Sequence, residues 1–297
     1  MILIAIPAKS QEQYLDDMIA AIDGMSVKPD KVLYMQDRPT GQERVEAMRK
    51  LKSHPIIEHY PVSSVPPYVG RPQMYLGVSQ FLTGFVREQA INYMVKNGYD
   101  QILFFDGDCI PEPDIVKDHL ECLSVDTPRV TVGMRKESMY GWLDQRTKPE
   151  SKAHIFYNVP KLVEDEYMFV DSGVVWTCNF GMNIAAVNFL KETNKTIYGR
   201  SEVFPSDFLG TWGGEDGFIG LECFYRKIDV MALPVGNNGI RHKYHPRPER
   251  KYQHTMFIQH LESHREELLY LLDRFGLNDR GIQYIDRDTM LAKIYNQ

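Results

Sequence analysis

The sequence predicts an α/β protein with a mostly parallel, doubly wound sheet flanked by helices. Short apolar runs without a polar break, typical of strands covered on both faces, alternate with segments whose apolar residues recur at helical spacing. Polar residues follow several of these runs directly, at the edge where an open α/β sheet binds its ligands. The 297 residues are 43% hydrophobic and 25% charged, which suits one large domain or two closely joined halves.

The first half of the chain carries this alternation most clearly. Gly24 and Gly98 are placed to end two of its helices. Residues 61–77 contain four prolines and few periodic apolar residues, which is typical of a functional or mobile loop. Strands are predicted at residues 2–6, 32–35, 56–60 and 102–105, and helices at residues 14–22, 42–52 and 81–94.

Two carboxylates follow the apolar run at residues 102–105. Asp106 and Asp108 flank Gly107, and residues two apart in an extended chain point the same way, so both carboxylates can face one cation. Carboxylate oxygens suit Mg²⁺ or Mn²⁺, which proteins often share with substrate phosphates. Asp114 is a candidate N-cap for the helix that follows. A second D-x-D, at residues 286–288, has no strand before it and is interpreted as a solvated turn.

Beyond residue 120 the alternation weakens, although strands are predicted at residues 129–133 and 230–233. Residues 179–183, with the sequence NFGMN, either contact a polar ligand through their small and amide side chains or form an ordinary turn, and the sequence leaves both open. An amphipathic helix is predicted from residue 257 to 275 and is ended by Gly276.

A second acidic group occurs at residues 211–217, TWGGEDG. Glu215 and Asp216 lie at the start of an apolar helical run, where the helix dipole stabilises acidic side chains, so capping is one interpretation. The other is catalysis, because a carboxylate within hydrogen-bond reach can take the proton from an attacking hydroxyl. Capping accounts for one acid and leaves Trp212 and Gly214 before a pair of acids unexplained.

Two histidines follow the last predicted strand. Either His242 or His245 could complete the metal shell that Asp108 begins, because imidazole is an acceptable Mn²⁺ ligand beside carboxylates. The surrounding stretch is basic and either closes over a diphosphate as a lid or forms a solvated charged face. Its basic residues are Arg241, Lys243, Arg247, Arg250 and Lys251.

Composition argues against some classes of protein. The net charge is -6, with 34 basic and 40 acidic residues, which disfavours a dedicated polyanion binder. The apolar run at residues 2–6 is too short for a signal peptide or a membrane span, so we expect a soluble, cytoplasmic protein. The four cysteines have no C-x-x-C spacing and are expected to be reduced.

Three blocks in order, FFDGDCIPEPD, WGGEDG and IRHKYHP, resemble the GT-A glycosyltransferases, in particular the inverting β-galactosyltransferase-like and chondroitin-polymerase-like branches. The resemblance implies a GT-A domain at residues 1–252, with a nucleotide-binding half at 1–120 and an acceptor half at 121–252. A C-terminal helical extension at 253–297 follows. The long loop at 61–77 and the absence of an N-terminal membrane anchor depart from the family pattern.

The resemblance also implies roles for individual residues. It makes Asp216 the catalytic base, with Glu215, Trp212 and Gly214 on the acceptor side. For the metal, Mn²⁺ or Mg²⁺, it implies Asp108 and Asp106, and it favours His242 over His245. The residues that it implies for the nucleotide sugar are Pro7, Ala8, Asp37, Arg87, Asp106 and Gly107.

Together these expectations describe a metal-dependent inverting glycosyltransferase, a hexosyl- or pentosyltransferase, that uses a nucleoside-diphosphate sugar, a UDP-sugar in particular. The acceptor is a hydroxyl on a glycan, a lipid-linked sugar or a modified nucleobase, so nucleic acid is a partner only as acceptor. Two alternatives stay open on the sequence. One is a non-catalytic protein that binds nucleotide sugars or glycans, and the other is a metal-dependent nucleotidyltransferase.

Overall fold

The structure of the protein is a computed structural model, and it describes part of the chain. All of the described residues belong to the first of two units into which the chain divides, Met1–Tyr244. The predicted C-terminal helical extension and the second D-x-D therefore lie outside them. The described residues are 1–63, 82–137, 168–169, 175, 177–199, 201–204, 219–220, 222–223, 226–234 and 239–243.

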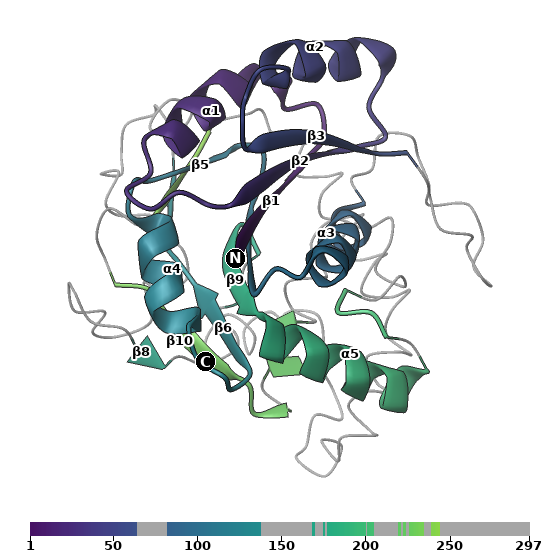
Figure 1. The fold of residues 1–297 in the computed structure, drawn as a ribbon, viewed down its shortest axis with the longest axis vertical. Coiled ribbons are helices and arrows are strands. Elements are labelled where there is room, and N and C mark those ends of the chain that lie inside the picture. The colour runs from purple at the N-terminus through teal and green to yellow at the C-terminus, as the bar shows by residue number, and fades with distance from the viewer. Residues whose placement is uncertain are drawn as a thin grey trace, which may run out of the picture. The chain divides into compact units, whose positions relative to one another are not determined.

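A mixed sheet of eight strands forms the centre of the protein, in the order β3-β2-β1-β4-β9-β6-β10-β8 (Figure 1). β1 pairs in parallel with both β2 and β4, and β9 is inserted antiparallel between β4 and β6. The predicted α/β class and mostly parallel sheet are confirmed. The strands are β1 (Ile2–Ala8), β2 (Lys31–Asp37), β3 (Ile57–Val62), β4 (Gln101–Phe105), β6 (Arg129–Val132), β8 (Met168–Phe169), β9 (Asn179–Asn183) and β10 (Asp229–Ala232).

Helices cover both faces of this sheet. α1 and α2 lie together over β1, β2 and β3, and α3 lies on the opposite side (Figure 1). A short 3-10 helix, η1 (Glu12–Tyr14), leads into α1, and Gly98 ends α3 in the left-handed conformation, as its position predicted. The helices are α1 (Leu15–Asp23), α2 (Gly41–Leu51), α3 (Thr83–Asn97), α4 (Ile115–Leu123) and α5 (Ile184–Tyr198).

The core has a layer on each face because the strands are apolar on both. One layer joins alternate residues of β1 to α1, α2 and α4, and each fully buried aliphatic side chain contributes about 1.5–3 kcal/mol. In the other layer, Phe104 of β4 stacks on Phe180 of β9 and meets Phe204 edge to face. The residues of the first layer include Ile2, Ile4, Ile6, Leu15, Met18, Ile22, Ala47, Leu51, Ile115 and Val116.

Residues 179–183 are the central strand β9, so the interpretation of NFGMN as a turn was wrong, whereas the ligand contact stays a prediction. Gly181 is required by packing, because a β-carbon there would lie 2.5 Å from the Thr131 hydroxyl and 2.8 Å from a Leu103 methyl. The Asn179 side chain is fully buried. It forms a hydrogen bond with His119 and donates another to the Met134 carbonyl.

Three further strands form a second, separate sheet in the order β5-β11-β7. β11 pairs antiparallel with β5 and parallel with β7. This sheet joins a segment just after β4 to a segment near the end of the described chain. Its strands are β5 (Cys109–Pro111), β7 (Arg135–Glu137) and β11 (Ile240–His242).

Among the described residues, no helix combines the length and the apolar character needed to cross a bilayer. All four cysteines are free and buried.

Candidate functional site

The candidate site lies at the carboxyl ends of β1 and β4, where the strand order changes direction. An open α/β sheet binds ligands at this switch point. The Gly107 amide donates to the Pro7 carbonyl at 2.9 Å, which ties the two strand ends together. A β-carbon at Gly107 would lie 2.8 Å from the Ala8 Cβ and 2.5 Å from the Gln11 Oε1, so glycine permits this approach. Pro7, Ala8 and Gly107, three residues predicted for the nucleotide, therefore lie together.

Asp37 ends β2 beside this switch point and is fully enclosed. Its side chain has 0% exposure, and Oδ2 accepts the Leu82 amide at 3.0 Å. The Lys9 ammonium lies 3.4 Å from the same oxygen, and the Arg38 Nε donates to Oδ1 at 2.8 Å. The Asp37 carboxylate therefore holds the Lys9 and Arg38 side chains at this edge of the sheet.

Arg87 and Asp106 form a second pair at this edge. Arg87 lies on α3 and its side chain is 2% exposed, while Asp106 directly follows β4 and is 28% exposed. One guanidinium nitrogen donates to Asp106 Oδ1 at 2.6 Å. A buried arginine is costly unless it is paired, so this contact fixes the Asp106 carboxylate at the mouth of the site.

Asp108 and His242 meet across the small sheet. His242 Nε2 lies 3.4 Å from Asp108 Oδ2, and both side chains are largely buried, at 13% and 8% exposure. The antiparallel register places His242 opposite Cys109, and the Lys243 amide donates to the Asp108 carbonyl at 2.6 Å. Two residues far apart in the sequence are thus held by backbone pairing.

Glu112 anchors the strand that carries His242. Its carboxylate accepts the Gly239 amide at 3.0 Å and lies 3.4 Å from the Arg241 Nε. Lys243, on the other side of His242, pairs with Asp17 of α1 at 2.7 Å. The basic residues nearest to His242 therefore make contacts that fit a charged face of the fold, and Arg241 is 70% exposed.

The Asp108 and His242 side chains suit a divalent cation. Neighbouring ligands of an octahedral ion with bonds of about 2.1 Å stand about 3 Å apart, close to the distance between these two atoms. Carboxylate and imidazole together are donors that Mn²⁺ accepts. Among the described residues, three side chains offer an ion ligand atoms that all lie within 4.8 Å of one another. They are Asp108, Cys109 and His242, and Asp106 is not among them.

Cys109, the third member of this group, was not predicted as a site residue. Burial raises the pKa of its thiol well above the usual value, and the neighbouring Cys178 and Asp108 raise it further. Cys109 also packs within the core layer of β1 and α1. A protonated, enclosed thiol is a poor ligand for a hard cation, so Cys109 supports the fold beside the site.

Glu88, the neighbour of Arg87 on α3, is a second residue that the sequence gave no reason to select. Its Oε2 accepts the amides of Val203 and Phe204 at 2.8 and 2.9 Å, and Lys191 lies 3.3 Å from its Oε1. Burial raises the pKa of Glu88 to about 7, against the lowering influence of Lys191 and the Phe204 amide. Glu88 thus ties the helix that carries Arg87 to the chain after α5.

The predicted acceptor and base residues lie outside the described part of the chain. They are Trp212, Gly214, Glu215 and Asp216, together with the alternative metal ligand His245.

Comparison with solved structures identifies the fold. TarS from S. aureus, solved in complex with UDP-GlcNAc, has a TM-score of 0.54 and 13% sequence identity over 83% of this chain. The mannosyltransferase PcManGT from Pyrobaculum calidifontis, in complex with GDP-Man and Mn²⁺, has a TM-score of 0.50 and 13% identity over 89% of this chain. The protein has a GT-A fold.

The likeness covers only part of each neighbour, because this GT-A chain spans 59% of the TarS chain and 64% of the PcManGT chain. No protein-family model and no curated protein matches the sequence. At this identity the likeness shows the fold alone.

Proposed function

We propose that this protein is a metal-dependent glycosyltransferase that takes a sugar from a nucleoside-diphosphate sugar. The observation that carries the proposal is the convergence, at the switch point of a GT-A fold, of the Arg87–Asp106 pair with the Asp108–His242 pair. The two neighbours, solved with UDP-GlcNAc and with GDP-Man and Mn²⁺, support a nucleotide-sugar donor. We take a UDP-sugar as the first candidate.

In this proposal the described residues bind and orient the donor. Arg87 holds the Asp106 carboxylate toward the ribose or the metal, and Pro7, Ala8 and Gly107 line the approach of the nucleotide. Asp108 and His242 would hold Mn²⁺ or Mg²⁺, which when bound neutralises negative charge on the departing diphosphate.

The chemical step is assigned to residues that lie outside the described part. We propose that Asp216 takes the proton from the acceptor hydroxyl and that the sugar is transferred in a single displacement with inversion. Glu215, Trp212 and Gly214 would position the acceptor. The W-G-G-E-D sequence supports this assignment, because simple nucleotide binding requires no base beside an acceptor.

The decisive experiment separates donor binding from transfer. Thermal stability of the full chain is measured against a panel of nucleoside-diphosphate sugars with and without MnCl₂, because ligand binding raises stability by mass action. Each donor that binds is then assayed for metal-dependent release of the nucleoside diphosphate. In a parallel assay with nucleoside triphosphates and sugar 1-phosphates, release of pyrophosphate would indicate a nucleotidyltransferase.

Asp216→Asn then tests the proposed base. We expect donor binding to persist while transfer falls by about 10²–10⁴-fold, the usual contribution of a general base. Asp286→Asn, in the second D-x-D, is the matched control and should leave both measurements unchanged. Normal turnover by Asp216→Asn would remove that residue from its role, and binding without any turnover in the wild type would indicate a binding protein.

A further inference from the structure

The loop after β1, residues 9–11, is fastened by a residue outside the site. Glu43 lies in the first turn of α2, and its Oε1 accepts the Ser10 hydroxyl at 2.6 Å. Its Oε2 accepts the Thr40 amide at 2.7 Å, while the Thr40 hydroxyl accepts the Glu43 amide at 3.3 Å. One carboxylate therefore joins the loop after β1 to the turn after β2.

Both joined segments contain a residue in the left-handed backbone region. Ser10 has a φ of 54° and Arg38 a φ of 46°, and the only other such non-glycine residue among those described is Lys227. A non-glycine residue keeps this conformation only where its surroundings hold it. Two of the three cases lie at this edge, which indicates that the loop shape is imposed here by contacts such as the Glu43–Ser10 bond.

The neighbours of Ser10 show what the loop shape controls. Lys9, on one side, reaches the Asp37 carboxylate at 3.4 Å. Gln11, on the other side, packs against Gly107, and its Oε1 is buried without a hydrogen-bond partner. Both side chains therefore border the switch point, and their placement depends on the backbone turn at Ser10.

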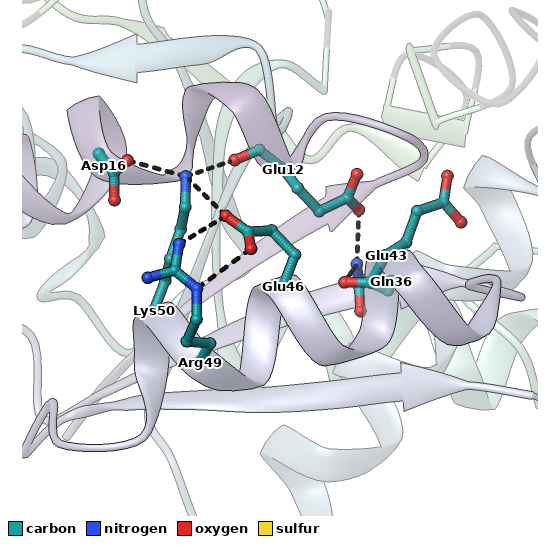
Figure 2. Close-up of polar contacts among 7 residues, drawn as sticks. All are labelled: Glu12, Asp16, Gln36, Glu43, Glu46, Arg49 and Lys50. Atoms are coloured by element: carbon teal, nitrogen blue, oxygen red, sulfur yellow. Dashed lines mark hydrogen bonds and ion pairs between the residues drawn. The ribbon is translucent and has the colours of Figure 1, made fainter.

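Glu43 is itself held firmly. Figure 2 shows Glu43 beside Gln36, whose amide donates to the Glu43 carbonyl at 3.3 Å and to the Glu12 carboxylate. Burial raises the pKa of Glu43, but hydrogen bonds from Ser10 and Thr40 outweigh it and lower the pKa below its usual value. The carboxylate is thus ionised at neutral pH, and bonds to an ionised acceptor are stronger than those to a neutral one.

Glu46, one turn along the same helix, provides the contrast. Its carboxylate pairs with Arg49 at 2.8 Å and with Lys50 at 3.5 Å, on the side of α2 that faces Asp16 of α1 (Figure 2). Glu46 has no bond to the loop after β1 among the contacts of the described residues. The two glutamates therefore differ in their connection to the switch point while sharing a helix.

We propose that Glu43 is a positioning residue for the nucleotide part of the donor. By locking Ser10 in its left-handed conformation, it holds Lys9 and Gln11 where a nucleoside diphosphate enters between β1 and β4. The inference rests on the proposed function and adds a residue that contacts neither the donor nor the metal.

The test uses the full chain and UDP and GDP, each with MnCl₂, as probes in isothermal titration calorimetry. Glu43→Ala should weaken binding of the preferred nucleotide by about tenfold, the loss expected for a bond to a charged group. Glu43→Gln should recover part of this loss, because its amide oxygen can still accept the Ser10 hydroxyl. Glu46→Ala, the matched control, should bind like the wild type.

Kinetics separate a positioning role from general destabilisation. With the preferred sugar donor, Glu43→Ala should raise KM by about tenfold and leave kcat within about threefold, whereas partial unfolding would lower the apparent kcat. Should Glu43→Ala fail to fold, Ser10→Ala removes the same bond from the loop side and should give the same change.

Each outcome bears on a different statement. Nucleotide affinity equal to wild type in both Glu43→Ala and Ser10→Ala overturns the positioning role and leaves the proposed function intact. A wild-type protein that binds neither nucleotide overturns the proposed function, and the positioning role falls with it.

Discussion

The polar side chains at the ends of β1, β2 and β4 differ from those of β9 in where their hydrogen bonds go. On β9, Asn183 accepts the amides of Ala186 and Arg129 and donates to the carbonyl of Thr127 at 2.8 Å. At the strand ends, Asp106 and Asp108 are paired with ionisable side chains from α3 and β11. The asparagine side chains of β9 form hydrogen bonds with backbone groups of the fold. The carboxylates of Asp106 and Asp108 instead form ion pairs at the carboxyl end of β4.

Under the proposed function, this difference separates residues that support the fold from residues that bind the donor and the metal. Removing a β9 amide should cost stability and leave chemistry unchanged in the folded fraction. Removing the Asp108 carboxylate, which faces His242, should cost activity with little change in stability. Comparing the stability and the activity of variants from the two regions therefore tests this difference.

The largest effect is expected from Asp108→Asn. It removes a negative charge and one oxygen from the Asp108–His242 pair, so transfer should fall by at least about a thousandfold and Mn²⁺ binding should be lost. The measurements are Mn²⁺ titration by electron paramagnetic resonance and metal-dependent donor turnover. Asp114→Asn is the control, because Asp114 makes no side-chain bond at the helix start. Unchanged Mn²⁺ affinity in Asp108→Asn would contradict the assignment.

A smaller but still large effect is expected from Asn183→Ala. This side chain is 2% exposed, and its loss leaves buried amides and carbonyls without partners. The free energy of unfolding should fall by about 2–4 kcal/mol, measured by urea denaturation. Asn97→Ala, which removes an exposed side chain at the end of α3, should change it by less than about 1 kcal/mol. A stable Asn183→Ala variant with reduced turnover would reverse the comparison.

The smallest effect is a pH dependence that comes from Glu88. Its pKa in the folded protein, about 7, exceeds the ordinary value of 4.5, so the folded state holds its proton more tightly than the unfolded state. The stability from this group is therefore complete below pH 4.5 and is lost as the pH rises through 7.

Glu88→Gln should remove this dependence while keeping an acceptor for the two backbone amides. Compared with the variant, the wild type should lose about 1–3 kcal/mol of unfolding free energy between pH 5 and pH 8. Parallel pH profiles for the two proteins would show that Glu88 does not titrate in this range.

The strands of the first half could be predicted because each is a short apolar run followed by a polar residue. Residues 102–105 became β4 (Gln101–Phe105), and Asp106 follows it at the edge where ligands bind. The sequence also predicted that a histidine late in the chain would lie beside Asp108. Which histidine stands there could not be derived from the residues alone, because it depends on the register between β5 and β11.

β9 shows where local sequence misleads. Asn, Gly and Asn favour turns in isolation, but the tertiary environment at Gly181 requires a residue without a side chain, and the asparagine amides are satisfied by loops and helices far along the chain. Cys109 and Glu88 were missed for a related reason. Their significance lies in burial and in partners from other elements, which no spacing reveals.

The pairing of β11 with β5 has a consequence for the order in which the protein becomes competent. Asp108 leaves the ribosome early, in the middle of a run of local β-α units, whereas His242 is synthesised near the end of the described chain. Contacts between distant parts of a chain form late because they close large loops. If the chain binds a cation as proposed, it can therefore shape the carboxyl ends of β1 and β4 well before it can hold that cation, and metal uptake marks the completion of this part of the molecule.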